Sequence, residues 1–134
     1  MGIFDFLKPQ KPQELPPEQQ RWNKMWDLWA DGELDSPYAS LMTYQSEVNN
    51  GGHDQYFFNT ANCGDLQAEV TAVLSLLPEV LRENLRRGYE AFAAQEDITD
   101  DTNEALFSEC DDVFYANEQL INQLLEAFAA TIKL

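Results

Sequence analysis

Basic residues are scarce in this 134-residue chain. It has 8 Lys and Arg and one His against 24 Asp and Glu, which gives a formal net charge of -16 at pH 7. Small soluble domains commonly carry a net charge of about 2–8 in magnitude. Surfaces that bind phosphate groups need Lys and Arg, so the composition argues against direct binding of nucleic acid or of anionic lipid. It favours a cationic partner, above all a basic protein.

Long apolar runs and targeting signals are also lacking. No stretch approaches the roughly 18–20 apolar residues that cross a bilayer, and Asp5 interrupts the apolar start of the chain with no cleavage site after it. We therefore expect a cytoplasmic protein that makes no membrane contact. The two cysteines, Cys63 and Cys110, are too few for a disulfide framework. Free thiols are the simpler interpretation, and a disulfide between the two stays open.

Motifs of catalysis and of metal binding are missing. The single histidine, His53, is followed by Asp54 but has no triad around it, although a Cys–His pair with Cys63 stays open. The acidic stretch of residues 97–112 lacks the central Gly and the register of an EF-hand loop. We expect no enzymatic activity, no cofactor and no dedicated metal site.

Four prolines within residues 8–17 (KPQKPQELPP) separate a short N-terminal segment from the rest of the chain. Proline fixes φ and removes a backbone donor, so a continuous helix cannot run through this segment. We predict a flexible leader over residues 1–14, dispensable for folding, and one acidic helical domain over residues 15–134. The chain is 44% hydrophobic and 12% aromatic, which is enough apolar material for a core.

Apolar residues recur at helical spacing through residues 15–134, and no stretch alternates as a β-strand does. The first example is a stripe that is typical of the core face of a helix: Trp22, Met25, Trp26 and Trp29. Pro, Gly, Asn and Asp punctuate the pattern. Helices are expected to begin near Pro16, Pro37, His53, Asp65, Pro78, Asp101 and Tyr115. The fold class is therefore all-α, a single-domain irregular bundle of about six or seven short helices.

The acidic residues are concentrated where basic ones are absent, since no Lys or Arg lies between Gly88 and Ile132. Asp97, Asp100 and Asp101 stand in a loop-forming stretch. If that stretch were helical, these three and Glu104 would share one face, and helical neighbours four positions apart lie about 6 Å apart at Cβ, similar to phosphates along a DNA strand. This stretch is either a solubilising face or a surface that presents carboxylates in place of phosphates. The candidate partner-binding residues are Asp97, Asp100, Asp101, Glu104, Glu109, Asp111, Asp112 and Glu118.

The most specific stretch is NGGHDQYFFN, residues 50–59. The two adjacent glycines permit a sharp reversal between helices. Tyr56 and Phe57 can anchor the helix that follows in the core. Gln55 and Asn59 lie one turn apart and can hydrogen-bond backbone groups exposed by the reversal.

This stretch resembles the signature N-G-G-x-x-Q-[FY]-[FY]-x-N of the bacterial DNA-mimic protein family. The signature falls on Asn50, Gly51, Gly52, Gln55, Tyr56, Phe57 and Asn59. His53 stands where the family often has an apolar residue. The resemblance runs from about Met25 to Ile132 and implies an acidic all-helical domain that resembles DNA to a helix-turn-helix transcription regulator.

We therefore expect a non-enzymatic binding protein that occupies the DNA-binding surface of a basic protein, such as a helix-turn-helix transcription regulator. An immunity or antitoxin-like protein that neutralises a basic toxin is the alternative, because both functions need the same electrostatics. A homodimer would extend the acidic surface.

Overall fold

The structure, a computed structural model, describes residues 14–97 and 99–134. The predicted leader lies outside these residues apart from the exposed Glu14. The described part is all-helical and contains no strand, so the predicted fold class is confirmed. None of its helices is both long enough and apolar enough to cross a lipid bilayer. The helices are α1 (Pro17–Ala30), α2 (Tyr38–Cys63), α3 (Leu66–Leu74), α4 (Glu79–Ala93) and α5 (Glu104–Ala129).

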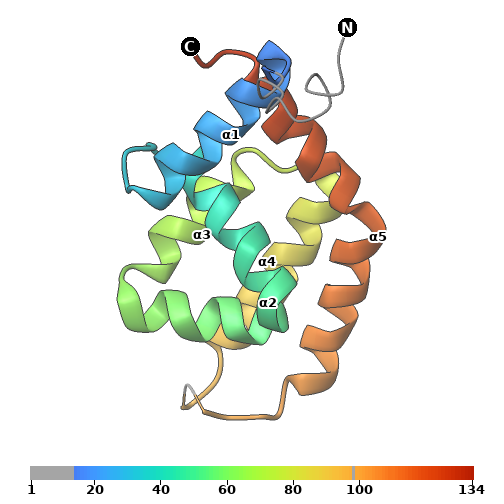
Figure 1. The fold of residues 1–134 in the computed structure, drawn as a ribbon. Helices are drawn as coiled ribbons and strands as arrows, with labels where there is room; N and C mark the ends of the chain where they lie inside the picture. Colours follow the sequence, from blue (N-terminus) through green and yellow to red (C-terminus); the bar gives the residue numbers. More distant parts are fainter. Residues whose placement is uncertain (1–13, 98) are drawn as a thin grey trace, which may run out of the picture.

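The long helix α2 occupies the middle of the molecule, and α3, α4 and α5 pack against it. Helix α5 runs along one side, and α1 packs against its C-terminal part (Figure 1). The described residues between α4 and α5, 94–97 and 99–103, lie at the opposite end of the molecule (Figure 1). The start of α1 and the end of α5 therefore share one end, and the acidic connection lies at the other.

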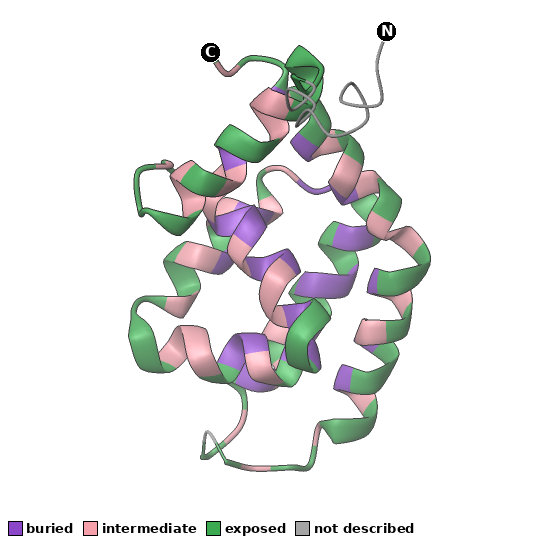
Figure 2. Cartoon of the chain, in the orientation of Figure 1, coloured by how far each residue is buried: buried purple, intermediate pink, exposed green. Residues whose placement is uncertain are grey.

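The core is built from the inward faces of all five helices, where the buried residues gather (Figure 2). Tyr56 and Phe57 are buried as predicted, and the Phe57 ring lies 5.3 Å from the ring of Phe92 on α4. Gly88 lets α4 come this close, because a Cβ at that position would lie 3.3 Å from the Phe57 ring. Aromatic packing of this kind contributes beyond the buried area alone.

The tryptophan stripe of α1 is a core face, as predicted. Met25 is fully buried, and the three tryptophans are partly buried against the core. Trp26 meets Trp22 and Trp29 edge-to-face, with ring centroids 6.1 and 5.4 Å apart. The Trp29 indole N–H also donates to the Thr43 hydroxyl at 3.0 Å, which fixes α1 to α2.

The structure has five helices where the sequence predicts six or seven. The two helical stretches expected on either side of Gly51 and Gly52 are present, but they meet directly at a kink, where both glycines have non-helical φ and ψ, and together they form α2. The helices expected before and after Tyr115 form the continuous helix α5, because no Gly or Pro interrupts residues 104–129. Asp101 does not cap α5 either. Asn103 precedes that helix, and its side-chain amide donates elsewhere, to the Ala91 carbonyl at 3.0 Å.

Candidate functional site

The signature residues build a kink in the middle of α2. Gly51 has φ -158° and ψ 17°, and Gly52 has φ 79° and ψ -178°. Glycine is essentially the only residue that adopts the conformation of Gly52. A Cβ on Gly52 would also lie 2.5 Å from the Asp111 carboxylate on α5. Gly52 is therefore needed both for the kink and for the close approach of α5.

A buried histidine ties this kink to its surroundings. The Asp111 carboxylate accepts from the backbone N–H of His53 at 2.8 Å and lies 2.6 Å from its Nδ1. The His53 Nε2 lies 2.6 Å from the Tyr44 hydroxyl, in the first half of α2. Asp111 thus occupies the N-terminus of the second helical half, where a carboxylate satisfies a free N–H and the helix dipole.

The chemistry of Asp111 and Tyr44 indicates which ring nitrogen of His53 carries a hydrogen. A carboxylate only accepts, so Nδ1 of His53 carries a hydrogen and donates it to Asp111. In a neutral ring Nε2 is then the acceptor, and the Tyr44 hydroxyl donates to it. Burial raises the pKa of Tyr44 well above its usual value, which keeps this hydroxyl protonated. Both ring nitrogens are occupied and the ring is buried, so His53 has a structural role here.

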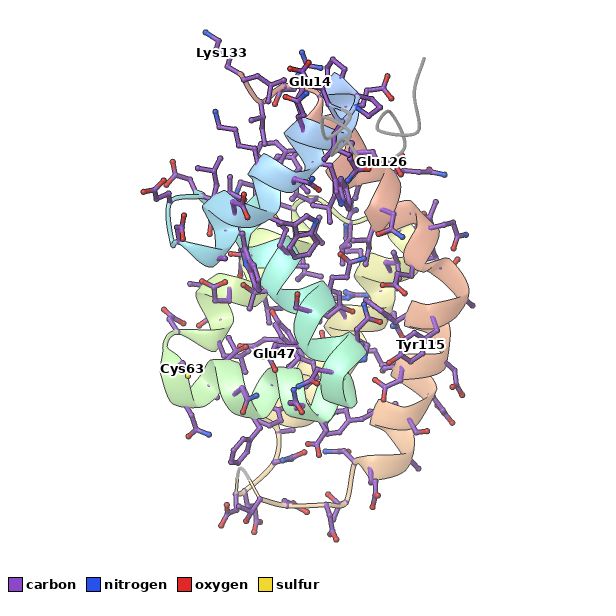
Figure 3. The ribbon with its side chains drawn as sticks, in the orientation of Figure 1. Glu14, Glu47, Cys63, Tyr115, Glu126 and Lys133 are labelled. Atoms are coloured by element: carbon purple, nitrogen blue, oxygen red, sulfur yellow. The ribbon has the colours of Figure 1, made fainter. Side chains whose placement is uncertain are left out.

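Gln55 and Asn59 do not bond the backbone of the reversal, so that prediction is wrong. Both side-chain amides donate to the carboxylate of Glu47 in the first half of α2, at 3.0 and 2.9 Å. Glu47 lies near the middle of the molecule in Figure 3. These hydrogen bonds to Glu47 hold the two halves of α2 at a fixed angle. Glu47 is a residue that sequence reasoning missed. The signal that could have found it is the need of both amides for an acceptor.

The predicted acids on α5 do not form one surface. Residues two turns apart share a helix face, so Glu104, Asp111 and Glu118 lie in one row that faces α2. The Glu118 carboxylate accepts from Gln45 at 3.0 Å and from Asn49 at 2.7 Å. Asp111 and Glu118 thus serve the packing of α5 on α2.

The other two α5 acids differ from these. Glu109 forms an ion pair with Arg87 of α4. Asp112 is exposed, and its side chain makes no hydrogen bond or ion pair with any described residue. Of the four acids between residues 109 and 118, only Asp112 therefore presents a carboxylate that is free for a partner.

The acids before α5 lie in turns, as the loop-forming residues of this stretch predict, so the row that a helix would form over residues 97–104 is absent. The Asp97 carboxylate accepts from the backbone N–H and the hydroxyl of Thr99, at 2.9 and 3.0 Å, and these bonds hold its pKa below the usual range. The Asp100 carboxylate accepts from the N–H of Thr102 at 2.9 Å. Asp side chains commonly stabilise turns by bonding the backbone two residues on.

Residues 99–101, the start of α5 and the second half of α2 line an open cleft of about 600 Å³. All of its charged lining residues that the structure describes are acidic, and we call it the acidic cleft. Phe58, 40% exposed, supplies an apolar wall. The acidic cleft is lined by Gly51, Asp54, Gln55, Phe58, Asn59, Thr99, Asp100, Asp101, Glu104 and Phe107.

The acidic cleft brings together three predicted partner-binding residues, Asp100, Asp101 and Glu104, with two that sequence reasoning missed. Asp54 and Phe58 are four residues apart on α2, a spacing that places them on one helix face. Among described residues, the side chains of Asp54, Asp101 and Glu104 have no hydrogen-bond or ion-pair partner. A cation could therefore be received here without displacing an internal contact.

Groups suited to other chemistry lie apart. Cys63 is exposed at the end of α2, whereas His53 is buried, so the two do not form a pair. Cys63 and Cys110 are free, and Cys110 is buried, which raises the pKa of its thiol. Within residues 14–97 and 99–134 no cluster of three or more His, Cys, Asp or Glu has the geometry to hold a metal ion.

Comparison with known proteins adds a family. The family model described as DMP19-like protein matches residues 33–132. This range contains the kinked α2, the acidic cleft and all of α5, and it leaves out α1. No curated protein and no solved structure matches the chain. Because the family model covers well over half of its residues, the chain belongs to the DMP19-like protein family.

Proposed function

We propose that this protein is a cytoplasmic, non-enzymatic binding protein that occupies the DNA-binding surface of a basic protein, such as a helix-turn-helix transcription regulator. The observation that carries the proposal is the acidic cleft, where Asp54, Asp100, Asp101 and Glu104 converge with no Lys or Arg among the described residues of the lining. The similarity of residues 50–59 to the DNA-mimic signature supports it.

The cleft suits the side chains with which proteins hold DNA. A concave site with one sign of charge focuses its field and speeds the encounter with an oppositely charged partner. Arg and Lys combine a cationic head with an apolar stem. The four carboxylates offer acceptors for the head, and the exposed ring of Phe58 offers a surface for the stem.

The proposed contact surface is narrower than the set of eight acids taken from the sequence. Asp97 and Asp112 are exposed carboxylates outside the lining of the acidic cleft, and we keep both from the predicted set. Three of the eight acids already bind other helices: Asp111 and Glu118 accept hydrogen bonds from α2, and Glu109 pairs with Arg87 of α4. We propose that these three stabilise the fold beneath the contact surface and do not meet the partner. The carboxylates proposed to meet the partner are Asp54, Asp97, Asp100, Asp101, Glu104 and Asp112.

The test begins with an affinity capture from the source lysate at low salt, followed by mass spectrometry. The expected result is a basic DNA-binding protein whose complex weakens as salt screens the charges, with a Debye length of about 8 Å at physiological ionic strength. The recovered protein should also be released by DNA that carries its own binding site. Capture of a basic toxin that DNA does not displace would favour the immunity function, and capture of non-basic proteins alone would contradict both.

A further inference from the structure

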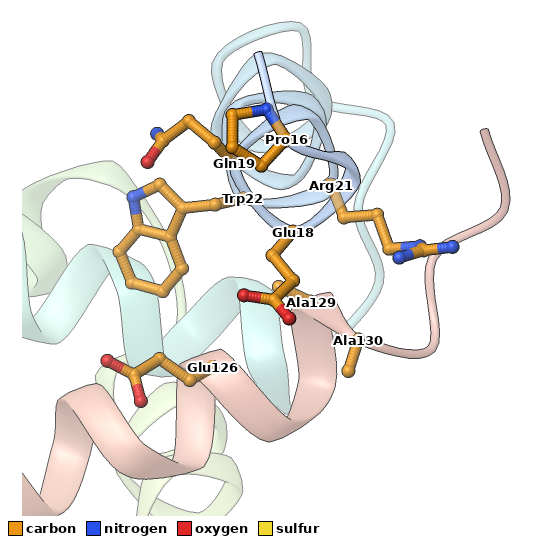
Figure 4. Close-up of a pocket in the computed structure, with 8 residues that line it drawn as sticks. All are labelled: Pro16, Glu18, Gln19, Arg21, Trp22, Glu126, Ala129 and Ala130. Carbon is orange, nitrogen blue, oxygen red and sulfur yellow. The ribbon is translucent and has the colours of Figure 1, made fainter.

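A second groove, of about 620 Å³, lies at the end of the molecule opposite the acidic cleft. It runs between the first turns of α1 and the last turn of α5 (Figure 4). Ala129 and Ala130 are small and leave its floor open, while Trp22 forms one wall. The proposed function makes no use of this groove.

The groove combines an aromatic ring with two carboxylates. Figure 4 shows the Trp22 indole, the Glu18 carboxylate and the Glu126 carboxylate around the same space. The edge-to-face contact of Trp22 with Trp26 holds the indole in place. Among the aromatic side chains, Trp attracts a cation over its ring most strongly.

The surrounding charges also favour a cation. Neither Glu18 nor Glu126 forms an ion pair with a described residue. The last turn of α5 contains no basic residue, so the partial negative charge at the end of this 26-residue helix has no basic side chain within that turn. Arg21 is the one basic residue among the described residues of the lining, and Figure 4 shows its guanidinium directed away from Trp22.

We propose that this groove binds an arginine side chain of a partner protein. The guanidinium stacks on the indole of Trp22 and pairs with Glu18 and Glu126, while the aliphatic stem packs over Ala129 and Ala130. Arginine fits better than lysine, because its planar guanidinium stacks on aromatic rings, is weakly hydrated and meets carboxylates with two N–H groups. Anions are disfavoured by both carboxylates.

The probe for this site is N-acetyl-arginine methylamide, with the citrulline analogue as a control of the same shape and no charge. The readout is the indole N–H signal of Trp22 in NMR spectra of the full chain, assigned by its loss in Trp22→Phe. We expect a saturable shift of this signal with the arginine probe and none with the citrulline probe. The signals of Trp26 and Trp29 should move less.

Two charge variants predict opposite effects. Glu126→Gln removes a partner of the guanidinium and should weaken binding roughly two- to fivefold, the size expected of an exposed ion pair. Arg21→Gln removes a competing cation and should strengthen binding. Glu90→Gln on α4, outside the groove, should leave the affinity unchanged and controls for net charge.

Three results would overturn the proposal. The first is no shift of the Trp22 signal, or an equal shift with the citrulline probe. The second is a change in the same direction for Glu126→Gln and Arg21→Gln. The third concerns the chain's own cations: if Lys8→Gln with Lys11→Gln moves the Trp22 signal without any probe, the occupant belongs to this chain and not to a partner.

Discussion

The carboxylate of Asp111 on α5 contacts two atoms of His53 on α2. It accepts from the backbone N–H of His53 at 2.8 Å and lies 2.6 Å from the His53 Nδ1. The two residues are 58 positions apart in the chain. An acid that the sequence assigns to a partner surface therefore stabilises the kink of α2. Surface charge and stability must be tested at different acids.

Asp111 and its neighbour Asp112 separate these two roles. Asp111→Ala leaves two N–H groups of the buried His53 without an acceptor. Hydrogen bonds to charged groups contribute about 1.5–3 kcal/mol, so we expect a loss of about 2–3 kcal/mol in the free energy of unfolding. Asp112→Ala removes the same charge from an exposed site and should change this free energy by about 0.5 kcal/mol or less. Equal losses in urea unfolding followed by circular dichroism would contradict the structural role of Asp111.

Three glycines separate backbone strain from steric contact. Gly64 has φ -179° and open space around it, so Gly64→Ala should be nearly neutral. Gly32 has φ 74° and equally open space, so Gly32→Ala should cost about 1–2 kcal/mol from strain alone. Gly52→Ala adds a contact with Asp111 to a positive φ and should cost more than Gly32→Ala. A smaller loss in melting temperature for Gly52→Ala than for Gly32→Ala would show that the kink does not require glycine.

Asp97 should titrate below the ordinary aspartate pKa of about 3.9, because Thr99 donates two hydrogen bonds to its carboxylate. A carboxylate whose pKa is lower in the folded state stabilises the fold at any pH above its pKa in the unfolded state. This contribution is lost as the pH falls through its pKa in the folded state. Thr99→Ala removes one of the two bonds, so the pKa should rise part of the way to the ordinary value. NMR titration of the carboxyl carbon measures it, and an unchanged pKa would contradict the turn geometry.

The two thiols should differ in reactivity. Cys63 is exposed, whereas Cys110 is buried and its pKa is raised, which leaves little of the reactive thiolate. A colourimetric thiol reagent should titrate one cysteine in the native protein and both in denaturant, and Cys63→Ser should abolish the native reaction. Two thiols reacting rapidly in the native protein would show that Cys110 is accessible.

Much of the fold follows from periodicity, and its failures have physical causes. The Trp22–Trp29 stripe and the burial of Tyr56 and Phe57 can be predicted, because apolar spacing reports a core face directly. The continuity of α5 through Tyr115 cannot be predicted in this way, since a change in side-chain pattern does not by itself break a helix. The acids of residues 97–101 have helical spacing, but the loop-forming residues around them predict the turns in which they lie, where Asp bonds nearby N–H groups.

The site is predictable only in part, because tertiary contacts decide which carboxylates stay free. Asp100, Asp101 and Glu104 could be chosen from charge alone. Asp54 and Phe58 could not, since the turn that completes their cleft is some 40 residues away in the chain. Nor does the sequence reveal that Glu118 is engaged by Gln45, whose amide comes from 73 positions away.

The role of the acidic cleft is tested most directly by two variants with the same change in charge. The first carries Asp54→Asn, Asp100→Asn, Asp101→Asn and Glu104→Gln. The second carries Asp27→Asn, Asp31→Asn, Glu33→Gln and Asp35→Asn. These exposed acids lie in the C-terminal part of α1 and in the residues that follow it. Each neutralises four carboxylates, so the net charge of -16 becomes -12 in both.

The measurement is the affinity of each variant and of the unaltered protein for the DNA-binding protein recovered by capture, across a range of salt concentrations. Exposed ion pairs contribute roughly 0.2–1 kcal/mol each. We therefore predict that the cleft variant binds roughly tenfold more weakly at low salt and with a shallower salt dependence, while the control variant binds almost as the unaltered protein does. Equal weakening of both variants, or weakening of the control alone, would contradict the assignment of the acidic cleft as the contact surface.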